Sequence, residues 1–199
     1  MPPRPKFSRD QLQAAALAIV DEEGLAALSM RSLAARLGTG PMTIYNYVSD
    51  RDDLDALLID AVMAKVALPA RGRDWQADLR VLVRALWRAV RAHRAVIPLI
   101  LTRRSGSETA LMPAEALLAV LAAGGRSGTD LLVAFRAVTG FVAGLAQAQL
   151  AEQDPAIERM AALAPDRFPR LIEIAGAAGG LDPDAELEAG LDLLIRGLS

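Results

Sequence analysis

The stretch Leu28–Val48, LSMRSLAARLGTGPMTIYNYV, limits most strongly what this chain can fold into. Its apolar residues and glycines predict two short helices joined by a tight turn, the pattern of a helix-turn-helix. Ser29 is placed to cap the first helix, and Gly38 stands where a helix end adopts the left-handed backbone conformation. Pro41 suits the first position of the second helix, because a nitrogen without a hydrogen costs nothing there.

The second helix, expected over Pro41–Val48, has one buried and one exposed side. Ile44 and Val48 are four residues apart, so they face the interior together. The exposed side presents a thioether, a hydroxyl, a phenol and an amide, from Met42, Thr43, Tyr45 and Asn46. Such groups suit the major groove of DNA, where bases offer hydrogen-bond partners and the thymine methyl. We therefore interpret this stretch as a DNA-reading element.

The net charge argues against a nucleic-acid binder, but the distribution of charge does not. The chain carries 22 basic and 24 acidic side chains, a formal net charge of −2. No acidic residue occurs from Gly24 to Ser49, although acidic residues crowd on both sides of this window. Arg4 and Lys6 form a basic arm before Ser8 that either reaches the DNA backbone or a minor groove, or remains a free tail.

The composition favours an all-α protein. Hydrophobic residues make up 53% of the chain but aromatic residues only 4%, and segments that alternate with period two are few. The absence of cysteine excludes disulfides and thiolate chemistry and fits a reducing cytoplasm. No secretory signal is visible, and no apolar run is expected to span a bilayer. We therefore expect a cytoplasmic protein without membrane contact.

Caps and helical periodicity divide the rest of the chain. A first helix follows the capping box at Ser8 and ends at Gly24, and Asp50 is placed to cap the helix after the helix-turn-helix. Further helices are expected over residues 50–68, 75–93, 95–101, 108–123, 130–153, 156–163, 168–177 and 182–198. Because Pro69–Asp74 is the best boundary, we expect three parts. They are a helix-turn-helix DNA-binding domain (1–50), a connecting helix (51–68) and a helical ligand-binding and dimerisation domain (69–199).

The longest expected helix carries small residues three or four positions apart on one side, which let a partner helix approach closely. These residues are Ala137, Gly140, Gly144, Ala148 and Ala151. The final helix adds Leu187, Leu191 and Leu194, with Gly190 among them. Two such helices from each protomer predict a four-helix homodimer interface, although the same stripes can pack within one chain.

The run SRDQLQAAALAIVDEEGLAALSMRSLAARLGTGPMTIYNYVSDRDDL resembles the DNA-binding domain of the TetR family of one-component bacterial repressors. The resemblance is specific over residues 7–66. The later segments WQADLR, RFPRLIEIA and ELEAGLDLLIRGLS resemble, more loosely, the subgroup that includes the tetracycline repressors. The resemblance implies an all-α homodimer with two helix-turn-helix heads and a C-terminal core that binds an inducer and then loosens the grip on DNA.

The resemblance also assigns roles to single residues. Contacts to base edges and thymine methyls are assigned to Arg31, Pro41, Met42 and Thr43. Phosphate contacts are assigned to Tyr45, Tyr47 and Arg51. Tyr47 lies close to Ile44 in helical angle, so a mainly packing role is the alternative there. The expected DNA-binding set is completed by Thr39, Gly40 and Asn46.

The ligand of the tetracycline repressors is not expected here. Those proteins bind the drug's magnesium through a histidine, and Ile100 takes the corresponding position. Leu82 and Leu86 replace polar and aromatic pocket residues, so we expect neither a metal nor a cofactor. The resemblance instead implies an apolar pocket, whose members can equally be ordinary core: Leu82, Leu86, Ile100, Met112, Phe135 and Thr139.

An enzyme is the main competing class. His93 is the only histidine, which excludes histidine clusters and Ser-His-Asp triads, and its arginine neighbours favour a solvated helix end. No glycine-rich nucleotide loop occurs. We predict a sequence-specific transcriptional regulator, a repressor released from a pseudo-palindromic DNA operator by a small apolar inducer. An activator on the same scaffold, or a ligand-binding helical protein without DNA function, is the alternative.

Overall fold

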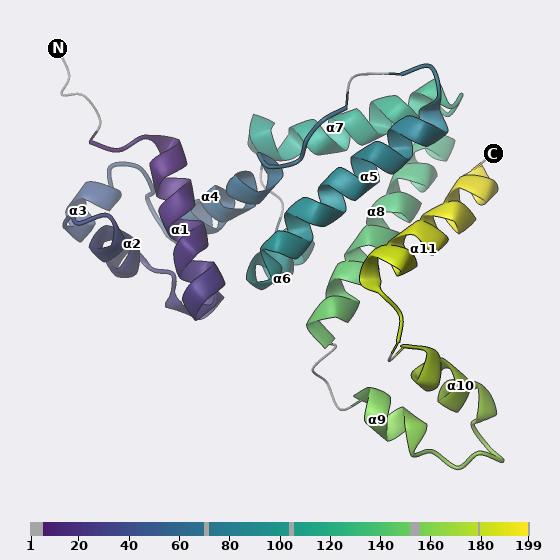
Figure 1. The fold of residues 1–199 in the computed structure, drawn as a ribbon. Coiled ribbons are helices and arrows are strands. Elements are labelled where there is room, and N and C mark those ends of the chain that lie inside the picture. The colour runs from purple at the N-terminus through teal and green to yellow at the C-terminus, as the bar shows by residue number, and fades with distance from the viewer. Residues whose placement is uncertain (1–5, 70–71, 104–105, 152–155, 179, 199) are drawn as a thin grey trace. The chain divides into compact units, whose positions relative to one another are not determined.

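The computed structural model describes residues 6–69, 72–103, 106–151, 156–178 and 180–198. This described part is helical and contains no strand, which confirms the predicted all-α class (Figure 1). Contacts divide the chain into two compact units, Met1–Phe135 and Arg136–Ser199. The expected functional domains, 1–50, 51–68 and 69–199, remain a prediction.

The first unit begins with helices whose starts match the sequence caps. Ser8 and Ser29 each close a capping box, and Asp50 accepts a hydrogen bond from the N–H of Asp53. Each cap satisfies a backbone donor that the helix leaves unpaired. The elements are α1 (Arg9–Glu23), η1 (Leu25–Ala27), α2 (Met30–Arg36), α3 (Pro41–Ile44), α4 (Arg51–Met63), α5 (Trp75–Ala92), η2 (Arg94–Val96), α6 (Ile97–Thr102), α7 (Glu108–Ala123) and the first part of α8 (Gly128–Ala151).

The head formed by α1, α2 and α3 is closed by α4, which packs along α1 (Figure 1). Its core consists of fully buried aliphatic side chains from all four helices. These include Leu12, Ile19, Leu33, Ile44, Leu54 and Leu58. Because each helix contributes only one apolar stripe, the short α2 and α3 depend on this shared core for their stability.

A second layer of the first unit is built from α5 and α7, which pack against each other (Figure 1). Its core includes Trp87 of α5, which is 2% exposed, and Leu121 of α7, which is fully buried. The start of α5 and the end of α7 meet where the guanidinium of Arg126 lies 4.5 Å from the centre of the Trp75 ring. This cation–π contact covers the end of the helix pair.

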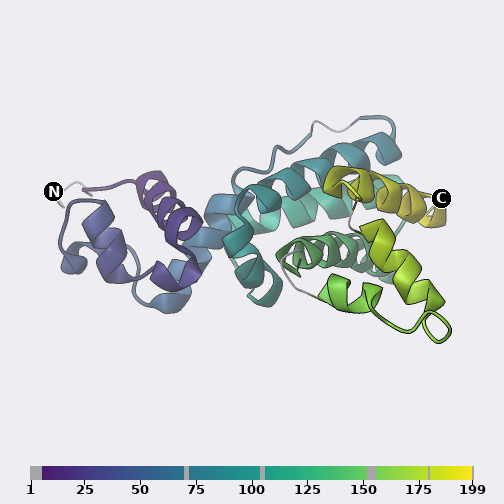
Figure 2. The ribbon, with the colours of Figure 1, turned by 60° about the horizontal axis from the view of Figure 1, so that its bottom comes forward.

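The second unit contains the rest of α8, α9 (Ala156–Ala161), α10 (Pro169–Ala178) and α11 (Pro183–Leu198). The helices α9 and α10 pack as a pair (Figure 2). A Cβ added to Gly190 of α11 would overlap the ring of Phe141 on α8. Gly190 therefore permits a close approach of α8 and α11 within one chain, which accounts for a glycine in a helix interior.

Within the described residues, the stretch Gly128–Ala148 of α8 is long and apolar enough to cross a membrane by length and composition. The expectation that no apolar run reaches this length is therefore wrong. Asp130 and Arg136 interrupt the stretch, so the sequence shows no continuous apolar run there. This finding alone is weak evidence for a membrane span, because the core helix of a soluble protein meets the same criteria.

Candidate DNA interface and ligand-binding region

Gly38 gives the turn between α2 and α3 its geometry. Its φ of +62° lies in the left-handed region that other residues rarely adopt. The N–H of Thr39 then donates to the carbonyl of Ala34 at 2.9 Å, which satisfies an acceptor at the end of α2. Gly40 leads directly into Pro41 at the first position of α3. The turn therefore forms as the sequence predicts.

The helix α3 is shorter than predicted and ends at Ile44 instead of Val48. The N–H of Asn46 donates to the carbonyl of Thr43, and the N–H of Tyr47 donates to that of Ile44, each reaching back three residues instead of four. The backbone is therefore tighter at Asn46 and Tyr47, and the N–H of Val48 again reaches back four residues, to the carbonyl of Ile44. Ile44 and Val48 are nevertheless buried as predicted, so the direction of the exposed face is preserved.

The expected reading face is open to solvent. Met42 is 76% exposed and Tyr45 is 49% exposed, and Asn46 is exposed beside them. On α2, the exposed Arg31 has no hydrogen-bond or ion-pair partner in the described part of the chain. The same turn also exposes Gly40 and Pro41, whereas Thr39 and Thr43 are partly covered. Arg31 and the α3 face are therefore accessible to an external partner.

Tyr47 is partly buried against the N-terminal segment. Its hydroxyl oxygen accepts a hydrogen bond from the N–H of Phe7 at 3.0 Å, and the centres of the two rings are 6.4 Å apart. The contact fits the packing alternative, while the hydroxyl proton remains able to donate to a phosphate. Phe7 is not among the predicted site residues, because its partner lies 40 residues away and no local pattern indicates the contact.

Arg51 is exposed, but hydrogen bonds to the protein hold it more firmly than a free phosphate ligand would be held. Its Nε donates to Asp55 at 2.8 Å, and its Nη1 donates to the carbonyl of Leu28 at 2.7 Å. Asp55 is buried, and Arg103 of the α6 end lies 3.6 Å from it. Arg51 therefore fastens the start of α4 to the segment before α2, and only its remaining N–H groups are available for the predicted phosphate contact.

Arg36 contributes less free positive charge than the acid-free window suggests. Its guanidinium forms two hydrogen bonds with Glu22, at 3.1 and 2.5 Å, and lies 3.7 Å from Glu23. The hydrogen bond from Arg36 lowers the pKa of Glu22 below its ordinary value, and the same bond raises the pKa of Arg36. Acidic residues just outside the window therefore neutralise one of its two arginines.

The Arg36–Glu22 pair predicts a small dependence of folding stability on pH. Because the pKa of Glu22 is lower in the folded chain, the pair stabilises the fold above the ordinary pKa. This contribution is lost as the pH falls through the lowered folded-state value. We expect the urea midpoint of the Glu22→Gln variant to fall less between pH 7 and pH 3 than that of the original protein. An equal fall of the urea midpoint in the two proteins between pH 7 and pH 3 would contradict this expectation.

A buried carboxylate, Asp60, joins the head to the second layer of the first unit. Asp60 of α4 is 1% exposed. Its Oδ2 lies 2.6 Å from the guanidinium of Arg9 on α1, and its Oδ1 accepts a hydrogen bond from Ser107, the cap of α7. A charge buried in this way is tolerated because it is paired and hydrogen-bonded. Asp60 thus fixes the position of α1 relative to α7.

His93 is not the solvated helix-end residue that the sequence predicts. It is 8% exposed, and its Nδ1 lies 2.8 Å from the Oδ2 of Asp21 on α1. The arginine neighbours Arg91 and Arg94 gave a misleading signal, because the partner of His93 is 72 residues away in the chain. His93 therefore provides a second tie between α1 and the α5 end.

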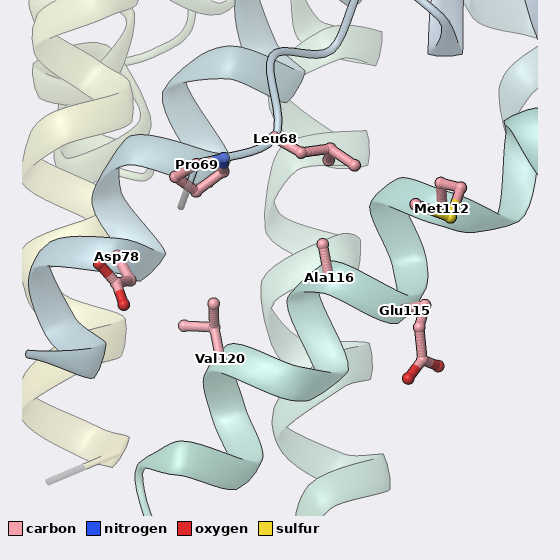
Figure 3. A pocket seen from close by; sticks show the side chains of 7 residues that line it. All are labelled: Leu68, Pro69, Asp78, Met112, Glu115, Ala116 and Val120. Carbon is pink, nitrogen blue, oxygen red and sulfur yellow. The ribbon is translucent and has the colours of Figure 1, made fainter. Parts of the chain in front are cut away.

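The ligand-pocket prediction fits the structure only in part. A pocket of about 190 Å³ lies between α7, the start of α5 and the segment after α4 (Figure 3). Its lining residues are Leu68, Pro69, Asp78, Met112, Glu115, Ala116 and Val120. Figure 3 shows Ala116 and Val120 on the α7 face toward Pro69, with Glu115 pointing away from Asp78.

Of the six predicted pocket residues, only Met112 lines this pocket. Leu82 is 2% exposed and belongs to the packed core, while Leu86, Ile100 and Phe135 are partly exposed. Thr139 is also partly exposed and lies on the part of α8 in the second unit. The pocket is smaller than the 300 Å³ or more that is typical of drug-sized ligand sites. Side chains must move before a large ligand fits it.

The candidate dimer residues separate into two groups. Ala137, Gly140, Gly144 and Ala148 are all exposed in the single chain, so the small-residue stripe of α8 is accessible. Leu187 and Leu191 of α11 are buried within the chain and present no surface to a partner, which corrects their assignment. Leu194 is partly exposed, whereas Leu193 next to it is 65% exposed and forms the open side of α11.

Two stretches of the chain match models of one protein family. Residues 12–55 match the family model "Bacterial regulatory proteins, tetR family", and residues 68–199 match "Tetracyclin repressor-like, C-terminal domain". An HTH-type transcriptional regulator of Saccharopolyspora erythraea is 32% identical over 98% of this chain and 86% of its own. The HTH-type transcriptional repressor DrrR1 of Streptomyces coeruleorubidus is 30% identical over 98% of this chain and 78% of its own.

A solved structure is similar over nearly the whole length of this chain. The crystal structure of the Streptomyces coelicolor TetR family protein ActR in complex with actinorhodin is 30% identical and covers 96% of each chain, with a TM-score of 0.81. Both regions of the chain thus match one family, in sequence and in fold. This chain belongs to the TetR family of bacterial transcriptional regulators.

Proposed function

We propose that this protein is a cytoplasmic repressor that binds a pseudo-palindromic operator as a homodimer and releases it when a small apolar ligand binds. The observation that carries the proposal is the open face of the helix-turn-helix, where Arg31 has no partner in the described part of the chain and Met42 is exposed. The protein acts by binding and needs no cofactor. We assign DNA binding to residues 1–50, linkage to 51–68, and ligand binding and dimerisation to 69–199.

The homodimer is supported by the exposed stripe of α8. Gly140 and Gly144 have open space around them in one chain, so a helix of a second chain can approach their backbone closely. A two-fold dimer also presents two heads, and together they can read the two half-sites of one long operator. The proposed interface consists of Ala137, Gly140, Gly144 and Ala148, with the open side of α11 around Leu193.

The ligand response is supported by the relatives and by the character of the C-terminal core. DrrR1 is named a transcriptional repressor, and ActR has been crystallised with actinorhodin. Here the residues at the tetracycline-repressor pocket positions, Leu82, Leu86 and Ile100, are aliphatic. They offer no ligand to a metal ion, so the proposed inducer is an apolar organic molecule that binds without one.

Two substitutions in the head test how the DNA is read. Arg31→Ala is expected to lose about 1–3 kcal/mol of discrimination at one base pair per half-site, because arginine distinguishes guanine through two hydrogen bonds. Tyr45→Phe is expected to weaken operator and random DNA alike, because a phosphate contact carries no sequence information. Competition binding with single-base operator variants measures both effects.

The control for these variants is Arg170→Ala, which removes an exposed arginine of α10 outside the head. It should leave both affinity and base preference unchanged. If Arg31→Ala and Tyr45→Phe lower binding to operator and random DNA by the same factor, the assigned division between base reading and phosphate contact is wrong.

The pocket between α5 and α7 gives a test of the ligand response. A panel of apolar organic molecules, together with actinorhodin as the ligand of the related ActR, is added to a fluorescent operator complex, with and without EDTA. At least one should release DNA in both conditions. Ala116→Trp should block that release by filling the pocket, whereas Ala122→Trp on the exposed side of α7 should not. Release that requires a metal would contradict the proposal.

A further inference from the structure

A chain of hydrogen bonds connects the N-terminal segment to the reading helix. The ammonium of Lys6 donates to the hydroxyl oxygen of Thr39 at 3.1 Å, and this hydroxyl donates to the hydroxyl oxygen of Thr43 at 3.1 Å. Thr39 lies in the turn before α3 and Thr43 lies within α3. These hydrogen bonds therefore connect a cation outside the helix-turn-helix to a side chain on its expected reading face.

Lys6 is held in this position by neighbouring contacts. The N–H of Phe7 donates to the hydroxyl of Tyr47, and the ring of Phe7 packs against that of Tyr47. The ammonium of Lys6 also lies 5.4 Å from the centre of the Phe7 ring. Together these contacts fix the segment just before α1 against the end of the reading element.

The charge of Lys6 sets the direction of the hydrogen bonds. An ammonium has three donors and no acceptor, so the Thr39 oxygen must accept from it. The positive charge favours the orientation in which the Thr39 proton points away from Lys6, toward Thr43. Thr43 then accepts from Thr39, and its own proton is left free to donate to a partner outside the protein.

We propose that Lys6 is a positioning residue that makes the Thr43 hydroxyl a hydrogen-bond donor and thereby sets the base preference at the position Thr43 meets. The acceptors that the major groove offers are N7 and O6 of guanine, N7 of adenine and O4 of thymine. Cytosine presents only a donor there and cannot accept the free proton of Thr43, so a base with an acceptor is preferred at the position that Thr43 contacts. This inference rests on the proposed DNA-reading role of Thr43.

The test compares base preferences of the full-length protein and its variants by selection from random DNA. In Lys6→Met, the preference at one position of each half-site should fall about three- to tenfold, the value of a single hydrogen bond, while the other positions keep theirs. Thr39→Val should lose the same preference, and combining the two changes should add nothing further. Lys6→Arg should keep the original base preference at that position, because a guanidinium, like an ammonium, only donates hydrogen bonds.

Lys65→Met, at an exposed lysine after α4, is the matched control for loss of one positive charge and should change nothing. Because Lys6 is exposed, Lys6→Met should keep the melting temperature of the original protein. An unchanged base profile in Lys6→Met would overturn the inference. Uniformly weaker binding with a salt dependence reduced by about one ion per head would also overturn it, because Lys6 would then be a phosphate ligand. If the original protein selects no site at all, the proposed DNA reading itself fails.

Discussion

Gly144→Leu is expected to convert the protein from a dimer to a monomer and to abolish operator binding. In the single chain, a Cβ added at Gly144 meets no atom outside the backbone of its own helix within 4 Å, and the position is exposed, so the protomer should fold normally. At a close helix contact, the added volume costs about 1–3 kcal/mol per copy. Two-fold symmetry applies this cost twice, so the dimer should dissociate about 30-fold to more than 10,000-fold more readily.

Gly144→Ala is the graded control for this variant. Alanine already occurs in the stripe at Ala137 and Ala148, so this smaller change should preserve the dimer. Analytical ultracentrifugation and circular dichroism separate loss of association from loss of folding. A Gly144→Leu protein that remains a dimer, with unchanged operator affinity, would show that another surface joins the protomers.

Ile44→Ala is expected to remove DNA binding while the dimer persists. Ile44 is the only fully buried side chain of the four-residue α3, and it anchors that helix to the core of the head. Truncating such a residue costs about 2–5 kcal/mol, which is a large fraction of the stability of a small domain. The proposed dimer interface on α8 lies in the second unit, so association should be retained.

The matched control is Met42→Ala on the exposed side of the same helix. It should leave the urea midpoint unchanged and alter only the preference for particular bases. If Ile44→Ala binds the operator as the original protein does, the position of α3 does not depend on this anchor.

Local signals in the sequence predicted the head well. The caps at Ser8, Ser29 and Asp50 each act over three residues, so their consequences can be derived without knowing the rest of the fold. The left-handed Gly38 and the buried Ile44 follow from similarly local patterns. These features are enough to place the reading face of α3 on the outside.

Interactions between distant segments were not predictable in this way. The bond from Arg51 to the carbonyl of Leu28 involves a backbone group, which every residue has, so no residue type announces it. The partner of His93 is an acid on α1 among many acids of the chain. The exact end of α3 depends on a change from four-residue to three-residue hydrogen bonds, which apolar spacing does not encode.

Helix faces and cavities depend on packing that periodicity alone leaves open. The leucines of α11 recur at spacings that fit either a chain core or a dimer contact, and the structure places Leu187 and Leu191 in the core. The pocket is formed in part by Leu68 and Pro69, which precede α5 and carry no motif. The location of the pocket could therefore be found only from the three-dimensional structure.

Selection from random DNA with the purified full-length protein tests whether a two-headed dimer reads the operator, because the recovered sequences reveal both the reading heads and their symmetry. We expect an inverted repeat whose half-sites are centred about one helical turn, roughly 34–36 Å, or somewhat more apart. Enrichment of no sequence, or of a single site without a repeat, would contradict a homodimer that reads DNA through α2 and α3.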